Sequence, residues 1–447
     1  MAKFIGEQAV VIGAGLGGLT AAAALAEFFS KVIVLERDAL PAHVEARAGC
    51  PQGRHVHALL AGGQAALESL FPGFENDLAA AGAVRINVGL DVRFEEPGHD
   101  PFPRRDLGII DYCMSRPLLE HVARNHVMRM HNVDLRANCV GKDVIGTPDR
   151  TAVTSVRCER GDGTSEVLAA DLVVDASGRG APSLEFLQVS GQPVQETSIG
   201  VDIRYSTAVF AVPPDAPADW KGVLVFADPR IDSRSAVLLP MEAGRWILTL
   251  YGAHGDAPPG DVEGFLAFAR QLRTSTVYNA VRNAEIQGEI ARFAFPASAR
   301  RHFERVEAFP RGLLPVADAI CCFNPAFGQG MSVAAQEACI LRQLLARLSA
   351  GVNPLARLAP AFLADIEAVI ATPWAVANVD FVYPQTRGER PADFEGTMKF
   401  MAALGRLAAR EPPVHKLMTE VRQLLKPLSV YHEPAFAQRV MAEMPSV

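Results

Sequence analysis

The chain has 447 residues, of which 49% are hydrophobic, and a formal net charge of −7. This length predicts two or three sub-structures around a large core, and the charge argues against a nucleic-acid partner. Its seven cysteines are odd in number and include no C-x-x-C pair. They favour a reducing cytoplasm and argue against a disulfide framework or a structural zinc site.

The N-terminal segment predicts a β-α-β unit. An apolar strand, a glycine-rich turn, an alanine-rich helix and a second apolar strand follow one another over residues 8–12, 13–18, 16–29 and 31–35. Gly13, Gly15 and Gly18 form a G-x-G-x-x-G turn, which lets a pyrophosphate approach the N-terminus of the helix. Glu36 ends the second strand, where a carboxylate can accept hydrogen bonds from an adenosine ribose. The unit therefore predicts a bound dinucleotide, and its glycines argue against a membrane span.

Five later segments carry the other candidate motifs. They read R-A-G-C-P-Q-G-R-H-V-H, S-R-P-L-L-E, D-L-V-V-D-A-S-G-R-G, G-L-L-P-V-A-D-A and N-P-A-F-G-Q-G-M-S, over residues 47–57, 115–120, 171–180, 312–319 and 324–332. His55 and His57 could suggest a metal, but no carboxylate accompanies them at ligand spacing. Packing of a cofactor loop is the better interpretation, and no metal site is predicted.

Between these motifs the chain is rich in β-prone runs. Short apolar runs bounded by turn residues cover 201–205, 223–226, 235–240 and 246–251, and a helix is expected over 262–272. Such a sheet would form the roof of a substrate cavity. The segment from Pro373 onward is helical by periodicity and is punctuated by prolines at 391, 412, 413, 427 and 434.

The order of the motifs resembles that of the group A flavoprotein monooxygenases, the FAD enzymes typified by para-hydroxybenzoate hydroxylase. The longer matches, P-Q-G-R-H-x-H, D-A-S-G-R-G and N-P-x-F-G-Q-G-M, look closer to the actinobacterial polyether epoxidases of the lasalocid and monensin type. The resemblance implies an α/β fold with a discontinuous, Rossmann-like FAD-binding domain (1–89, 107–187 and 295–371). An inserted antiparallel β-sheet substrate domain (90–106 and 188–294) and a C-terminal helical cap (372–447) would complete it.

The resemblance also implies a set of FAD-binding residues. They are Gly13, Gly15, Gly18, Glu36, Arg37, Arg47, Arg116, Asp318, Pro325, Gly328, Gly330, Met331 and Ser332. Arg47 and Arg116 would reach phosphate or ribityl oxygens, and Asp318 would hydrogen-bond the ribityl chain. The backbone of 328–332 would face the pyrimidine end of the flavin. Physical chemistry supports this last role, because a helix N-terminus at Gly330 places positive potential where reduced flavin carries negative charge.

Two positions depart from the family pattern. Ala317-Asp318 stands where the family has Gly-Asp, which retains the carboxylate and is expected to matter little. Asp175-Ala176-Ser177-Gly178 replaces the D-G motif that contacts both FAD and NADPH. Direct use of NAD(P)H and supply of electrons by a partner flavin reductase therefore both stay open.

The resemblance implies a cytoplasmic FAD-dependent monooxygenase of secondary metabolism. A flavin C4a-hydroperoxide would transfer one oxygen from O2 to a hydrophobic, polyketide-like substrate, with alkene epoxidation as the first expectation. Hydroxylation of a similar or aromatic substrate, and a geranylgeranyl-reductase-type flavin reductase or dehydrogenase, are the alternatives. A halogenase is disfavoured because no lysine lies between Lys31 and Lys142 and the three tryptophans are far apart.

No side chain is assigned a catalytic role, since the cofactor carries the chemistry. Aromatic and polar residues of the β-rich region are the candidate substrate contacts, although ordinary core packing is the commoner role for each single aromatic residue. They are Arg204, Tyr205, Phe226, Trp246 and Tyr251.

Overall fold

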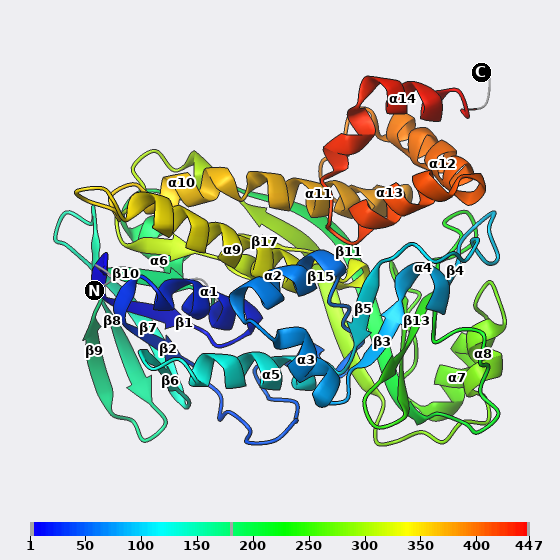
Figure 1. Ribbon diagram of the computed structural model, residues 1–447, viewed down its shortest axis with the longest axis horizontal. Coiled ribbons are helices and arrows are strands. Elements are labelled where there is room, and N and C mark those ends of the chain that lie inside the picture. The colour runs from blue at the N-terminus through cyan, green and yellow to red at the C-terminus, as the bar shows by residue number, and fades with distance from the viewer. Residues whose placement is uncertain (1–3, 179–181, 445–447) are drawn as a thin grey trace.

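The computed structural model describes residues 4–178 and 182–444. Arg179 and Gly180, which end the D-A-S-G-R-G motif, lie outside the described residues. A parallel sheet occupies the left-hand half of the molecule and a mostly antiparallel sheet the right-hand half (Figure 1). The second sheet is built largely from the β-rich region of the sequence.

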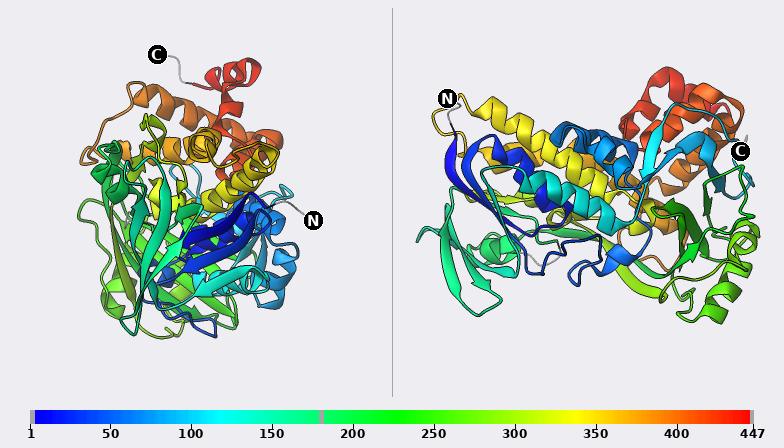
Figure 2. Two further views of the ribbon diagram at one scale, coloured as in Figure 1. Left: turned by 90° about the vertical axis from the view of Figure 1, so that its left-hand side faces the viewer. Right: turned by 60° about the horizontal axis from the view of Figure 1, so that its bottom comes forward.

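The parallel sheet has five strands in the order β16-β10-β1-β2-β6. Their bounds are Leu313–Pro315, Leu172–Asp175, Gly6–Ile12, Phe29–Leu35 and Val133–Arg136. Three helices pack beside one another on it, α1 (Leu16–Ala26) contacting both α5 (Arg116–Met128) and α9 (Gly330–Leu348) (Figures 1 and 2). The predicted helix over 16–29 is too long. Phe29 is fully buried and already pairs with Gly6 at the start of β2.

The larger sheet has seven strands in the order β17-β15-β11-β14-β13-β12-β4. Their bounds are Cys321–Cys322, Ala291–Arg301, Glu196–Ala211, Arg245–Gly252, Ser235–Met241, Gly222–Val225 and Val92–Glu95. The run predicted at 201–205 is thus part of a longer strand, and the expected domain boundary at residue 295 falls inside β15. β4, from the segment 90–106, pairs in parallel with β12.

The two faces of the larger sheet have different partners. α7 (Val262–Arg270), inside the range predicted for a helix, and α8 (Thr276–Val281) cover one face and bury Phe210, Trp246 and Leu248. The opposite face, called here the inner face, carries Val209, Val237, Leu239 and Ile247 and packs toward β3 and β5. Side chains alternate between these faces along each strand.

The remaining elements surround the two sheets. The further strands are β3 (Val84–Asn87), β5 (Ile110–Cys113), β7 (Cys139–Gly146), β8 (Val153–Arg160) and β9 (Ser165–Ala169). The further helices are α2 (Ala61–Leu70), α3 (Phe74–Ala80), α4 (Val88–Asp91), α6 (Pro182–Val189), α10 (Leu358–Asp365) and α11 (Glu367–Ala377). All seven cysteines are free thiols.

Three C-terminal helices form a bundle at the upper right of Figure 1: α12 (Phe394–Arg410), α13 (Pro412–Arg422) and α14 (Pro434–Met441). α13 and α14 begin at prolines, where the missing N–H removes no helical hydrogen bond. The expected start of this part at residue 372 falls inside α11, which continues through Pro373.

Within the described ranges, no single helix is long and apolar enough to cross a membrane. One bent pair, Leu358–Asp365 with Glu367–Val382, passes that test by length and composition alone.

Candidate functional site

The first glycine turn is tightly packed. Gly13 has a φ of +103°, and a Cβ there would lie 2.5 Å from the carbonyl oxygen of Ala176. A Cβ on Gly18 would lie 1.9 Å from the carbonyl oxygen of Gly13. Gly15 is the N-cap of α1, and no side chain caps that helix. The first N–H groups of α1 are therefore available to an anion that approaches the turn.

The carboxylate of Glu36 lies directly beside this turn. Its Oε2 accepts a hydrogen bond from the N–H of Ala14 at 2.9 Å, and its Oε1 accepts one from the N–H of Asp38 at 3.0 Å. Nη1 of Arg47 lies 3.0 Å from Glu36 Oε2. Arg37 points elsewhere: it is exposed and donates to the carbonyl oxygen of Gly49 at 3.3 Å.

Arg47 and Arg116 meet at Glu120, a residue that the sequence analysis did not single out. Nε of Arg47 donates to Glu120 Oε2 at 2.9 Å, and Nη2 of Arg116 lies 2.7 Å from Oε1. Burial raises the pKa of Glu120, but the two guanidinium groups outweigh it and hold the pKa at about 2. The four-residue spacing from Arg116 was the available sequence signal, because opposite charges at i and i+4 meet on a helix.

A short 3₁₀ turn, η3 (Ala317–Ala319), joins the two glycine motifs. A Cβ on Gly17, in the first turn of α1, would lie 2.8 Å from the Cβ of Ala317. A Cβ on Gly330, the first residue of α9, would lie 3.8 Å from Oδ1 of Asp318. Asp318 therefore lies between the N-termini of α1 and α9, which come from motifs about three hundred residues apart.

Ala317 adopts a left-handed backbone conformation, with a φ of +54°. The exchange of glycine for alanine is therefore more than a neutral change, since this conformation costs an alanine about 1–2 kcal/mol. The N–H of Ala317 donates to Oε2 of Glu337 at 2.7 Å. Burial and the nearby Asp318 carboxylate raise the pKa of Glu337 to about 7, although the hydrogen bond from Ala317 lowers it in part. This buried carboxyl had no signal in the sequence.

The second glycine loop passes through η4 (Pro325–Phe327) and turns at Gly328, whose φ is +66°. No side chain caps α9, and Oε1 of the N-cap residue Gln329 is buried without a hydrogen-bond partner among the described residues. Oγ of Ser332 accepts a hydrogen bond from the N–H of Leu60 at 3.1 Å. The next residue toward the loop, Met331, is buried. This end of α9 therefore presents unused polar backbone and side-chain groups.

Two of the candidate substrate residues lie on the inner face beside this loop. The rings of Tyr205 and Tyr251 are 5.7 Å apart between centroids, and the hydroxyl of Tyr205 donates to Oδ1 of Asn324 at 3.3 Å. Nδ2 of Asn324 in turn donates to Asp380 at 2.9 Å. Burial raises the pKa of Asp380 to about 6 despite this bond. The loop, the sheet and the segment after α11 therefore meet at Asn324.

The other three candidates are placed differently. Trp246 stacks on Trp220 in the core beneath α7, on the face opposite to Tyr205, so its expected role as a cavity wall is corrected to core packing. Arg204 is exposed and also points away from the inner face, because adjacent strand residues alternate. Phe226 follows β12 and is half-buried.

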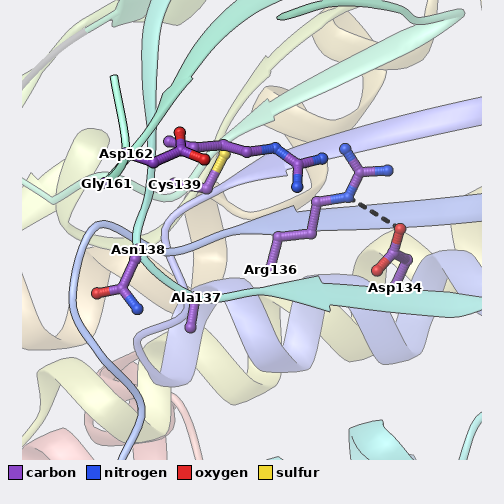
Figure 3. A pocket seen from close by; sticks show the side chains of 8 residues that line it. Asp134, Arg136, Ala137, Asn138, Cys139, Gly161 and Asp162 are labelled. Atoms are coloured by element: carbon purple, nitrogen blue, oxygen red, sulfur yellow. Dashed lines mark hydrogen bonds and ion pairs between the residues drawn. The ribbon is translucent and has the colours of Figure 1, made fainter. Parts of the chain in front are cut away.

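An open hollow of about 730 Å³ lies at a distance from these residues, at the ends of β6 and β8 (Figure 3). In it, Nε of Arg136 donates to Asp134 at 2.9 Å. The hollow borders the Glu36–Asp38 segment, since the N–H of Asn138 donates to the carbonyl oxygen of Asp38. Its lining is charged and it does not reach the inner face, which makes it a poor site for an apolar substrate.

Comparison with known proteins gives a family. No protein-family model matches the chain. Protein Rv3254 of Mycobacterium tuberculosis (strain ATCC 25618 / H37Rv) is 36% identical over 360 residues, which cover 78% of this chain and 75% of that protein. The chain belongs to the family of Rv3254.

Solved structures share the fold. The flavin-dependent brominase Bmp2 matches with a TM-score of 0.67 and 16% identity over 98% of both chains. PnpA, a p-nitrophenol 4-monooxygenase from Pseudomonas putida DLL-E4, matches with a TM-score of 0.65 and 17% identity over 95% of this chain and 99% of that one. PqsL of Pseudomonas aeruginosa, described as a probable FAD-dependent monooxygenase, matches with a TM-score of 0.61 and 17% identity over 83% of this chain and 96% of that one. The α/β architecture expected from the sequence is confirmed.

Proposed function

We propose that the chain is an FAD-dependent monooxygenase that adds one oxygen atom from O2 to a hydrophobic substrate, with alkene epoxidation as the first reaction to test. The observation that carries this proposal is the junction at η3, where Ala317 touches the first turn of α1 and Asp318 lies next to the first residue of α9. A cofactor with a pyrophosphate at one end and a polar ring at the other matches a pair of helix N-termini held in this way.

The residues present fit FAD. The uncapped start of α1 and the glycine turn would hold the pyrophosphate, with Glu36 beside the ribose. Asp318 would bind the ribityl chain. The uncapped start of α9 and the unpartnered Oε1 of Gln329 would face the flavin ring. Arg47 reaches the turn, because its Nη2 lies 3.8 Å from the position of a Cβ on Gly15.

The arginines act here more as positioning groups than as free positive charges. Arg47 and Arg116 contact three carboxylates, those of Glu36, Asp38 and Glu120. Their charge is therefore largely balanced within the protein, and the helix N-termini supply most of the remaining attraction for an anion.

The inner face of the larger sheet suits an apolar substrate. Its residues Val209, Val237, Leu239 and Ile247 form one cluster with Val56 and Cys113. Reduced FAD, when bound, would supply the two electrons that activate O2, so that one oxygen atom of O2 goes to the substrate and the other to water. These side chains, packed against β3 and β5, exclude water from this side of the sheet, since water promotes unproductive side reactions. This apolar wall favours an alkene or another neutral group over a charged one.

The environment of Asp175 bears on the source of electrons for the flavin. Asp175 is fully buried, and its carboxylate accepts hydrogen bonds from the N–H and hydroxyl of Ser177 and from the N–H of Ser183. Both oxygens of this carboxylate therefore already accept hydrogen bonds from residues nearby in sequence. This supports delivery of electrons by a partner flavin reductase, with NAD(P)H as the alternative donor.

The test uses FAD-loaded protein that is reduced chemically without oxygen and then exposed to isotope-labelled O2 and an alkene-bearing polyketide. Gain of one labelled oxygen with loss of the alkene indicates epoxidation, and the same gain with the alkene retained indicates hydroxylation. Gain of two hydrogens without oxygen would instead support a reductase of the geranylgeranyl-reductase type. Equal conversion by free reduced FAD would contradict an enzymatic role.

A further inference from the structure

His55 heads a chain of buried polar groups that no role described so far requires. Its Nδ1 lies 2.7 Å from Oγ1 of Thr207, and that oxygen lies 2.6 Å from Oγ1 of Thr249. The N–H of Val56 donates to Thr249 Oγ1 at 3.0 Å. Nε2 of His55 is buried and has no hydrogen-bond partner among the described residues, and the side chain is only 6% exposed. A polar atom enclosed in this way needs a partner.

Hydrogen accounting along this chain fixes which ring nitrogen carries the proton. Thr249 Oγ1 already accepts a hydrogen bond from the N–H of Val56. Among these polar groups, the hydroxyl proton of Thr249 has one acceptor, which is Oγ1 of Thr207. The hydroxyl of Thr207 then donates to Nδ1 of His55. If instead Nδ1 of His55 donated to Thr207 and Thr207 donated to Thr249, the hydroxyl proton of Thr249 would have no acceptor among these groups. His55 is therefore the Nε2–H tautomer, which makes the unpartnered atom a hydrogen-bond donor.

The ring is also neutral. Burial, together with the positive charge of Arg54, lowers the pKa of His55 to about 4. The donor is thus an uncharged N–H at ordinary pH.

His55 lies where the sheet meets the second glycine loop. Its ring centroid is 6.0 Å from that of Tyr205 and 5.7 Å from that of Phe293, both on the larger sheet. Three residues further on, Ala58 touches Gly328: a Cβ on Gly328 would lie 3.1 Å from the Cβ of Ala58. The segment from His55 to Leu60 therefore spans the space between the expected substrate wall and the expected flavin loop.

We propose that the Nε2–H of His55 binds a neutral oxygen acceptor of the substrate, a ketone or ester carbonyl, and so orients a hydrophobic molecule against the inner face. This inference rests on the proposed function. A neutral acceptor fits better than a carboxylate, because the donor is an uncharged ring and the aromatic rings of Tyr205 and Phe293 lie beside it. His55 is a positioning residue for the substrate and takes no part in proton transfer.

The first test reads the tautomer directly and needs neither substrate nor activity. Nitrogen NMR of histidine-labelled protein, with the His55 signals assigned by their loss in His55→Gln, is expected to show a neutral ring protonated at Nε2. A ring protonated at Nδ1, or one that titrates near the ordinary histidine pKa, would overturn the proposal. Because this measurement is independent of FAD, it separates failure of this inference from failure of the proposed function.

The second test measures ligand preference in FAD-loaded protein by equilibrium dialysis. The probes are nootkatone, a hydrophobic ketone, and valencene, its analogue with a methylene in place of the carbonyl. We expect wild-type protein to bind nootkatone about tenfold more tightly than valencene, as one good hydrogen bond provides. His55→Gln, whose amide can donate from the place of Nε2, should retain the preference. His55→Asn, which retains a partner for Thr207 but lacks the distal donor, should lose it.

The matched control is His415→Asn. His415 is similarly buried and burial also lowers its pKa to about 4, but it lies in α13 beside Phe102. This variant should retain the preference for nootkatone. Absence of nootkatone binding to wild type, or a preference that survives in His55→Asn, would contradict the proposal.

Discussion

Replacing Gly17 with alanine should loosen the junction between α1 and η3. The new methyl group would lie 2.8 Å from the Cβ of Ala317 and 3.8 Å from the Cβ of Ala334. Neither neighbour can rotate away, so the helix must shift, and overpacking of this kind costs about 1–3 kcal/mol. Alanine gains at most about 1 kcal/mol over glycine as a helix former. A net loss of up to about 2 kcal/mol is therefore expected.

The magnitude can be measured by calorimetry and by FAD occupancy of the purified variant. With an unfolding entropy of about 2.1 cal/mol/K per residue, a loss of about 2 kcal/mol over 447 residues lowers Tm by about 2 °C. Ala317→Gly should rescue Gly17→Ala, because it removes the opposing methyl and the strain of the positive φ at Ala317. A coupling free energy of about 1–3 kcal/mol between the two substitutions is expected.

The control is Gly405→Ala in α12, where an added Cβ meets nothing within 4 Å. It should stabilise the protein by up to about 1 kcal/mol. The reasoning would be refuted if Gly17→Ala proved more stable than wild type. It would also be refuted if the effects of Gly17→Ala and Ala317→Gly were simply additive.

Two further predictions concern the carboxyl groups around η3. Asp318→Ala should yield largely FAD-free protein, measured as the ratio of flavin to protein absorbance. The control Asp149→Ala, on an exposed turn, should retain full FAD occupancy. Full occupancy in Asp318→Ala would show that the ribityl assignment is wrong. The folded-state pKa of Glu337 is raised to about 7 from 4.5, so this group's contribution to stability is lost as pH rises through that window. The free energy of unfolding of Glu337→Gln, measured in urea, should therefore be close to that of wild type near pH 5 and exceed it near pH 8 by up to about 3 kcal/mol. Parallel pH profiles of the two proteins would contradict the raised pKa of Glu337.

The local elements around the first glycine turn were predictable because their signals are local. The strand, turn, helix and acid follow one another within about thirty residues, and the fixed spacing from Gly18 to Glu36 brings the carboxylate to Ala14. The second motif was likewise placed at the start of a helix, since Gly328 and Gly330 flank its N-cap residue, Gln329.

The features that the sequence did not reveal depend on how strands pair and on which face of the sheet each side chain takes. Tyr205 and Arg204 are neighbours in sequence, yet they point to opposite faces of β11, and the strand's register against β15 shifts between Gly200 and Ile203. A run of apolar residues does not tell which face Trp246 takes when both faces are buried. The hydrogen bonds of His55 and Val56 join a loop to two strands that lie 152 and 193 residues further along the sequence, a juxtaposition that no spacing rule encodes.

The FAD content of the protein is the most direct test of the central claim that the two glycine motifs form one cofactor site. Protein reconstituted with excess FAD, freed of unbound flavin and then denatured should release about one flavin per chain, and that flavin should chromatograph as FAD. Release of no flavin, or binding of FMN in preference to FAD, would contradict the account, because the pyrophosphate turn at Gly13–Gly18 would then have no ligand.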